Sequence, residues 1–213
     1  MAFDGSAYTH EISAPALLDN LLADGRIPPF VAIRPDSGTA EMRNRELACH
    51  APFAEFLVGE LLPWARQKVH FTDDPRWTFV AGSSYGGLAS SYVALQHPEV
   101  FGNVLSQSGS YWWVPEGAPE DERLTRQYAL APRKPLRFYM DVGALETGNA
   151  MIEGGPDQRL SNRHLRDVLQ AKGYPVHYTE YSGGHDYIWW QGTLADGLLA
   201  LLKGRRWKAS LGG

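Results

Sequence analysis

The sequence predicts a doubly wound α/β fold, in which helices cover both faces of a mostly parallel sheet. Short apolar runs alternate with longer amphipathic stretches, which is the pattern of repeated strand–helix–strand units. The chain has 213 residues, of which 44% are hydrophobic and 21% charged, and it contains no internal repeat and no low-complexity linker. This length and balance favour one soluble domain over residues 1–213.

The expected strands are short apolar or β-branched runs bounded by Pro, Gly or charged residues. They are Phe30–Ile33, Trp77–Ala81, Asn103–Ser106, Leu136–Val142 and Val176–Tyr181. Apolar side chains at helical spacing predict helices over 53–62 (ending before Pro63), 88–95, 161–173 and about 193–203. The segment 110–134 breaks this alternation. It is either a lid or wall of a site, or a solvated connection with a short helix.

Charge and composition limit the partners that the chain can have. The formal net charge of −4 gives no indication of a nucleic-acid or membrane partner, since both attract basic chains. No apolar run approaches the roughly 18 residues that span a bilayer, and the N-terminus lacks the pattern of a signal peptide. The single cysteine, Cys49, excludes an internal disulfide and a zinc site built from several thiolates. A cytoplasmic protein is the expectation, and none of these features predicts an oligomeric state.

A candidate nucleophile lies in Gly82-Ser83-Ser84-Tyr85-Gly86, which matches the motif G-x-S-x-G. Such a motif alone occurs often by chance. Here it directly follows an expected strand and directly precedes an expected helix, as a nucleophile elbow requires. Ser84 is then the nucleophile, and the backbone N–H of Tyr85 is one donor of an oxyanion hole. The alternative is a glycine-rich strand-to-helix turn without a chemical role.

The general base is expected at His185. A serine hydroxyl is a poor nucleophile until a positioned imidazole takes its proton. In an α/β-hydrolase the chain order is serine, acid, histidine, and the histidine follows the last strand. Among the seven histidines, His185 alone has this place, directly after Val176–Tyr181 and the glycines 183 and 184. His177, by contrast, lies within that strand.

Glu146 is the expected acid, because it follows the strand that precedes the last helix–strand pair. Its carboxylate would orient the imidazole and stabilise the imidazolium. Asp157 and Asp186 are rivals, and a solvated loop glutamate is the other interpretation of Glu146. The second oxyanion donor should come from an upstream loop, where Gly5 or Ser6 offers an N–H.

With these residues placed, the chain resembles the enterochelin-esterase-like branch of the esterase D family. This branch includes ferric enterobactin and salmochelin esterases and is related to feruloyl esterases. The matching stretches span almost the whole chain. They are FDG (3–5), GRIPP (25–29), RNREL (43–47), FLVGELLPW (56–64), AGSSYGG (81–87), LSQSGSYWW (105–113), DVGALE (141–146) and GGHD (183–186).

The resemblance implies an α/β-hydrolase fold and hydrolysis of carboxylic esters through an acyl-enzyme, with no metal or other cofactor. The implied substrate is a small ester, either the siderophore trilactone of catecholamide serines or an aromatic acyl ester. In that setting Arg43 or Arg45 would bind acidic or catecholate groups, or would tie to a nearby carboxylate. Trp112 and Trp113 would stack on aromatic rings, or would belong to the core.

Two other functions are compatible with the same residues. One is an acyltransferase, in which an alcohol intercepts the acyl-enzyme. The other is a truncated hydrolase-like protein without turnover, because Met1-Ala2-Phe3 stands where the family's third strand should be ending. We therefore expect an α/β-hydrolase domain that lacks the N-terminal strands. It would be a fragment of a longer protein, or the strands would come from elsewhere.

Overall fold

The computed structural model describes residues 1–148 and 157–205. Within these ranges the centre of the molecule is a parallel sheet of four strands in the order β1-β2-β3-β4. The strands are β1 (Phe79–Ser83), β2 (Asn103–Gln107), β3 (Arg137–Gly143) and β4 (Val176–Tyr181). β1 begins two residues later than expected, because a short 3₁₀ turn, η2 (Pro75–Trp77), precedes it. All four carboxyl ends meet at one edge of the sheet.

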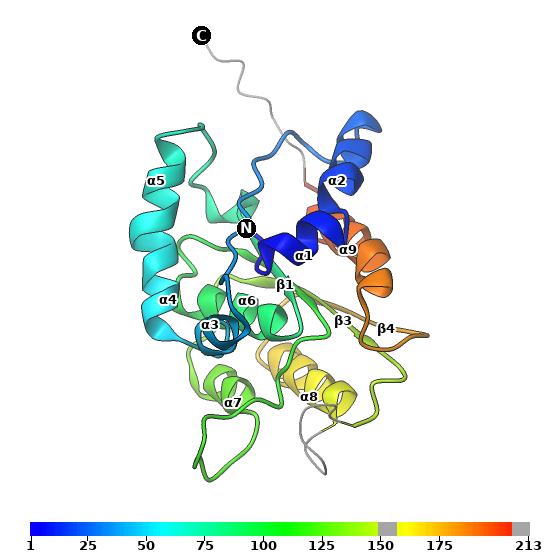
Figure 1. Cartoon of the computed structure of the whole chain (residues 1–213). Helices are drawn as coiled ribbons and strands as arrows, with labels where there is room; N and C mark the ends of the chain where they lie inside the picture. Colours follow the sequence, from blue (N-terminus) through cyan, green and yellow to red (C-terminus); the bar gives the residue numbers. More distant parts are fainter. Residues whose placement is uncertain (149–156, 206–213) are drawn as a thin grey trace.

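Helices enclose the sheet on both faces, which confirms the doubly wound α/β fold (Figure 1). One face carries α6 (Tyr85–Gln96), α7 (Arg123–Leu130) and α8 (Gln158–Ala171), and the other carries α1 (Gly5–His10), α2 (Ala14–Ala23) and α9 (Tyr187–Leu202). Successive strand side chains enter opposite cores: Val80 and Val104 face the first group, while Ala81, Leu105 and Tyr139 face the second. None of the helices in the described ranges is long and apolar enough to cross a membrane.

The first residues of the chain lie beside β1. Ala2 forms an isolated parallel bridge with Ala81, whose carbonyl accepts the N–H of Phe3 over 3.0 Å. Phe3 is buried in the same core as β1 and α6. These contacts hold Asp4 and the start of α1 close to the carboxyl end of β1.

The strand expected over Phe30–Ile33 is wrong. The segment is extended, and the carbonyl of Ile33 accepts the N–H of Ala2 over 2.9 Å, but no ladder forms there in the described part of the chain. Phe30 and Val31 are 43% and 37% exposed, so the apolar run that suggested a buried strand lies at the surface.

A helical segment precedes β1. It contains α3 (Ala40–Glu46), α4 (Ala51–Phe56), a π-helical turn η1 (Leu57–Leu61) and α5 (Leu62–Arg66). The expected end before Pro63 is wrong, since the helix continues through this residue to Arg66. Proline donates no backbone hydrogen bond, and the wider π turn directly ahead of it accommodates that loss.

The segment 110–134 is partly core. Tyr111 and Trp112 are buried, 116–117 are exposed, and α7 then buries Leu124 and Tyr128. The short helix that one of the two interpretations included is therefore present, and it packs inward.

Two helices begin earlier than the sequence indicated. α8 starts at Gln158 rather than at Ser161, because the side chain of Asp157 accepts a backbone N–H and caps it. α9 starts at Tyr187, well before the expected start near residue 193, because Asp186 caps it in the same way.

Candidate active site

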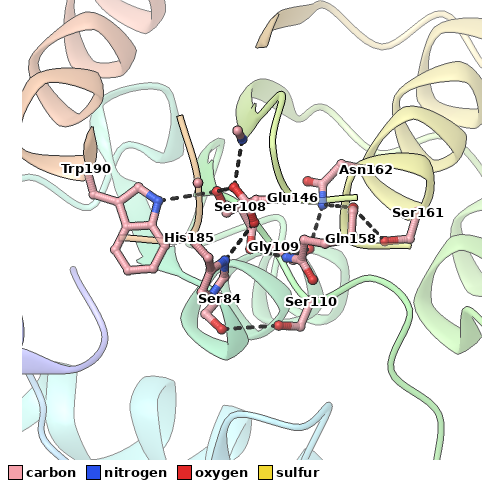
Figure 2. Close-up of polar contacts among 12 residues, drawn as sticks. Ser84, Ser108, Gly109, Ser110, Glu146, Gln158, Ser161, Asn162, His185 and Trp190 are labelled. Atoms are coloured by element: carbon pink, nitrogen blue, oxygen red, sulfur yellow. Dashed lines mark hydrogen bonds and ion pairs between the residues drawn. The ribbon is translucent and has the colours of Figure 1, made fainter. Parts of the chain in front are cut away.

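Each strand of the sheet is followed by a polar residue of the candidate site. Ser84 follows β1, Ser108 follows β2, Glu146 lies three residues after β3 and His185 lies four residues after β4. Because the carboxyl ends of parallel strands meet at one edge, four segments far apart in the sequence converge there. Figure 2 shows these residues together.

Ser84 occupies a strained turn between β1 and α6. Its backbone angles are φ 56° and ψ −121°, a conformation that L side chains rarely adopt. The turn is tight enough that a Cβ on Gly82 would lie 2.4 Å from the carbonyl carbon and oxygen of Gly86. The turn has the strained, close-packed geometry that a nucleophile elbow needs, and it requires glycine at 82.

Neighbouring loops fix the elbow. The N–H of Ser84 donates to the carbonyl of Gln107 over 2.9 Å, and the carbonyl of Ser84 accepts the N–H of Ser110 over 3.0 Å. The hydroxyl of Ser84 lies 3.3 Å from that of Ser110. The Ser84 hydroxyl is therefore held against the loop that follows β2.

Glu146 presents a buried carboxylate, with a side chain only 3% exposed. Its Oε1 accepts the N–H of Gly143 and the hydroxyl of Ser108, both over 2.7 Å, and the hydroxyl of Tyr181 over 3.3 Å. Burial alone would raise the pKa of Glu146. The hydrogen bonds from His185, Ser108 and Gly143 and the charge of His185 outweigh it, so the pKa is lowered.

His185 lies between the carboxylate of Glu146 and Ser84. Its Nδ1 lies 2.7 Å from Oε2 of Glu146, and Figure 2 shows the imidazole between Glu146 and Ser84. Since an ionised carboxylate only accepts hydrogen bonds, Nδ1 carries the proton and Nε2 is free to accept one. The ring packs edge-on against Trp190 at 4.9 Å, and its side chain is 40% exposed. It is both oriented and accessible.

The two aspartates that compete with Glu146 for the role of the acid have structural roles instead. Asp157 and Asp186 cap α8 and α9, as described above. Of the other histidines, His177 stacks on Tyr139 and His164 contacts Glu122 over 2.5 Å. The structure thus joins His185 to Glu146 by a hydrogen bond, with Ser84 beside the imidazole, and gives these rivals other partners.

Ser108 is a site residue that the sequence reasoning missed. Its φ of 47° is unusual for a residue with a side chain, and its hydroxyl donates to Glu146 while accepting the indole N–H of Trp190 over 3.3 Å. The available signal was the polar run Gln107-Ser108-Gly109-Ser110, which directly follows the expected strand Asn103–Ser106.

Two side chains of α8 support this run from behind. The amide nitrogen of Gln158 donates to the carbonyls of Ser108 and Gly109, over 2.5 and 3.0 Å, and Asn162 donates to Gly109 over 2.7 Å (Figure 2). Trp112 donates its indole N–H to Gln158 and is buried. Trp112 therefore belongs to the scaffold of the site.

The backbone donors of the expected oxyanion hole differ in their availability. Tyr85 is the first residue of α6, where N–H groups have no partner within the helix. The N–H of Gly5 donates to the carbonyl of Pro35 over 3.0 Å, and that of Ser6 donates to Asp36 over 2.8 Å. Among the residues that the structure describes, the N–H of Asp4 has no acceptor.

The arginines expected to bind substrate have different surroundings. Arg43 forms a bidentate ion pair with Asp4, over 2.6 and 2.7 Å, and its guanidinium lies 5.8 Å from the ring centre of Tyr85. It thus ties residue 4 to the start of α6. Arg45 is exposed, and Trp113 is half-buried against the first core.

A second buried carboxyl, Asp141, makes the stability of the protein depend on pH. Burial raises its pKa to about 8, and the charge of Glu146 acts in the same direction. An unfolded aspartate ionises near pH 4. The stability that neutral Asp141 contributes is therefore complete below about pH 4 and is lost as the pH rises through about 8.

We expect Asp141→Asn to remove this dependence, because asparagine does not ionise. Between pH 5 and 8 the free energy of unfolding of the wild type should fall by on the order of 3 kcal/mol more than that of the variant. Urea unfolding at several pH values measures this. Parallel curves for the two proteins would contradict a raised pKa at Asp141.

Comparisons with known proteins agree with this geometry. The family model named Esterase, described as "Putative esterase", matches residues 1–201. The iron(III) enterobactin esterase of Dickeya dadantii is 36% identical over 96% of this chain and 47% of its own length. The iron(III) salmochelin esterase of Escherichia coli is 32% identical over 94% of this chain and 49% of its own. The chain spans about half the length of these curated relatives.

Solved structures lead to the same group. The enterobactin esterase of Shigella flexneri superposes with a TM-score of 0.84 at 32% identity, over 94% of this chain and 51% of that one. A ferulic acid esterase superposes with a TM-score of 0.73 at 18% identity, which supports the fold alone. The α/β-hydrolase fold and the resemblance to enterobactin and salmochelin esterases are confirmed. The chain belongs to the esterase family.

Proposed function

We propose that this chain hydrolyses carboxylic esters through an acyl-enzyme formed on Ser84. The observation that carries the proposal is the hydrogen-bonded link from Glu146 to His185 beside a serine in a strained elbow. The three residues follow three different strands, so the sheet itself sets their relative positions. Such an arrangement activates a serine hydroxyl at neutral pH.

The reaction begins when Nε2 of His185 takes the proton of Ser84 and Oγ adds to the ester carbonyl. Glu146 keeps the imidazole in the required tautomer and stabilises the imidazolium that forms. His185 then gives the proton to the departing alcohol. Water completes the cycle by the same steps and releases the carboxylic acid.

Backbone amides stabilise the oxyanion of the tetrahedral intermediates. The N–H of Tyr85 is the first donor in this proposal, and the positive end of the α6 dipole supports it. For the second donor we favour Asp4 over Gly5 and Ser6, because the amides of the latter two already have acceptors. The ion pair with Arg43 would hold Asp4 in place.

The substrate proposed is a small ester with an aromatic acyl group that carries acidic hydroxyls. The relatives named above are enterobactin and salmochelin esterases, which suggests this class. Arg45 is exposed and could pair with an anionic oxygen, whereas Arg43 has only the part of its guanidinium that Asp4 does not use. Tyr85 and Trp113, both half-buried, offer rings for stacking.

A comparison of wild type and Ser84→Ala tests the proposal. With a p-nitrophenyl ester, kcat/KM of the wild type should exceed that of the variant by at least about 10⁴-fold. Equal rates would end the proposal. A panel of enterobactin, feruloyl and short-chain esters then tests the substrate class, and a preference for short aliphatic esters would contradict it.

A further inference from the structure

The hydroxyl of Ser110 lies against the nucleophile. Ser110 is 2% exposed, and its Oγ lies 3.3 Å from Oγ of Ser84 (Figure 2). Its backbone N–H also donates to the carbonyl of Ser84, over 3.0 Å. These two contacts fix the Ser110 hydroxyl relative to the reacting oxygen.

The surrounding contacts keep Ser110 in this place. The carbonyl of Gly109 accepts hydrogen bonds from Gln158 and Asn162, over 3.0 and 2.7 Å. On the opposite side the loop packs on α6 so closely that a Cβ on Gly87 would lie 2.8 Å from Cα of Gly109. Ser110 cannot move away from Ser84 without disturbing both sides of the loop.

The direction of the hydrogen bond follows from the available partners. Among the residues that the structure describes, Ser84 is the hydrogen-bond partner of the Ser110 hydroxyl, and burial separates this hydroxyl from bulk water. A buried hydroxyl generally keeps a partner. Since Ser84 gives its own proton to His185 in the proposed reaction, Ser110 is the donor in the bond between the two serines.

We propose that Ser110 is a catalytic residue that donates a hydrogen bond to Oγ of Ser84 and thereby promotes hydrolysis of the acyl-enzyme. The inference rests on the proposed esterase function. In this step water loses a proton to His185 and adds to the acyl carbonyl. The bond between the carbonyl carbon and Oγ then breaks, its electron pair stays on Oγ, and His185 returns the proton there as the carboxylic acid leaves.

Donation to Oγ should favour this step more than the formation of the acyl-enzyme. The ester oxygen of the acyl-enzyme is a weak acceptor that becomes a strong one as the bond breaks, so the hydrogen bond strengthens in the transition state. During acylation the same donation also withdraws electron density from the attacking oxygen. The two effects oppose each other there, and the net change is small.

Ser110→Ala tests this assignment, with Ser90→Ala as the matched control. Ser90 is a fully buried serine of α6 whose hydroxyl donates to the carbonyl of Gly86, so the control removes a buried hydroxyl that does not contact Ser84. With an activated ester such as p-nitrophenyl butyrate, kcat/KM reports acylation and kcat reports deacylation. Intact mass spectrometry after rapid quenching gives the acylated fraction.

In Ser110→Ala we expect kcat to fall about tenfold while kcat/KM changes less than about threefold, and the acylated fraction to rise. In Ser90→Ala the relation between kcat and kcat/KM should stay as in the wild type. Proportional losses in kcat and kcat/KM, or values equal to the control, would overturn the role of Ser110 and leave the esterase proposal standing. Wild-type turnover that does not depend on Ser84 would overturn both.

Discussion

Replacing His185 by alanine is expected to lower kcat/KM for an activated ester by at least about 10⁴-fold. Without the imidazole no group takes the proton of Ser84, and the departing alcohol receives none. His185 also occupies the position between Glu146 and Ser84, and its ring contacts Trp190 at 4.9 Å in a T-shaped arrangement. Initial rates with a p-nitrophenyl ester, together with circular dichroism of the folded variant, measure the effect.

His177→Ala is the matched control for this substitution. His177 is exposed on β4 and stacks on Tyr139, away from the carboxyl edge of the sheet. Its loss should leave kcat/KM within about threefold of the wild type, as expected for a surface substitution. If the two variants lost activity to the same extent, His185 would not be the general base.

Removal of the acid should have the second largest effect. Glu146→Ala is expected to lower kcat by about 10³- to 10⁴-fold, less than the loss of the base. The imidazole would remain, but it would lose the acceptor of its Nδ1 proton and the buried negative charge that stabilises its cation. The hydroxyl of Ser108 and the N–H of Gly143 would also lose their shared acceptor.

Asp157→Asn and Asp186→Asn are the controls, because both residues compete with Glu146 in the sequence. Each cap oxygen remains in the amide, so the helices should stay intact and the rates close to wild type. A loss at either position comparable to that of Glu146→Ala would move the acid to that residue. Rates from all three variants at one pH decide the matter.

The sequence predicts the contact between Glu146 and His185 because the strand topology alone places the two residues close together. Once 77–81, 136–142 and 176–181 are recognised as parallel strands, the residues that follow them must gather at one edge of the sheet. Motif position then selects Ser84, and loop position selects the other two. The contact between Nδ1 of His185 and the carboxylate of Glu146 follows from this topology without any detail of side-chain packing.

The supporting contacts could not be predicted in this way. Ser108 reaches Glu146 through a positive φ that the sequence does not signal, since no glycine or asparagine marks the position. Gln158 approaches the same loop from α8, whose start depends on a cap at Asp157 that the helical periodicity does not indicate. The strand predicted over Phe30–Ile33 is absent for a related reason. Apolar composition predicts burial, but a strand also needs a paired neighbour.

The central claim is that Ser84 is the residue that becomes acylated. The most direct test is to mix the protein with p-nitrophenyl butyrate, quench it with acid within the first turnovers, and locate the butyryl group by peptide mass spectrometry. We expect the group on the peptide that contains Ser84, at Ser84 itself, with no modification in Ser84→Ala. A butyryl group on Ser83, Ser108 or Ser110, or the same modification in Ser84→Ala, would contradict the account.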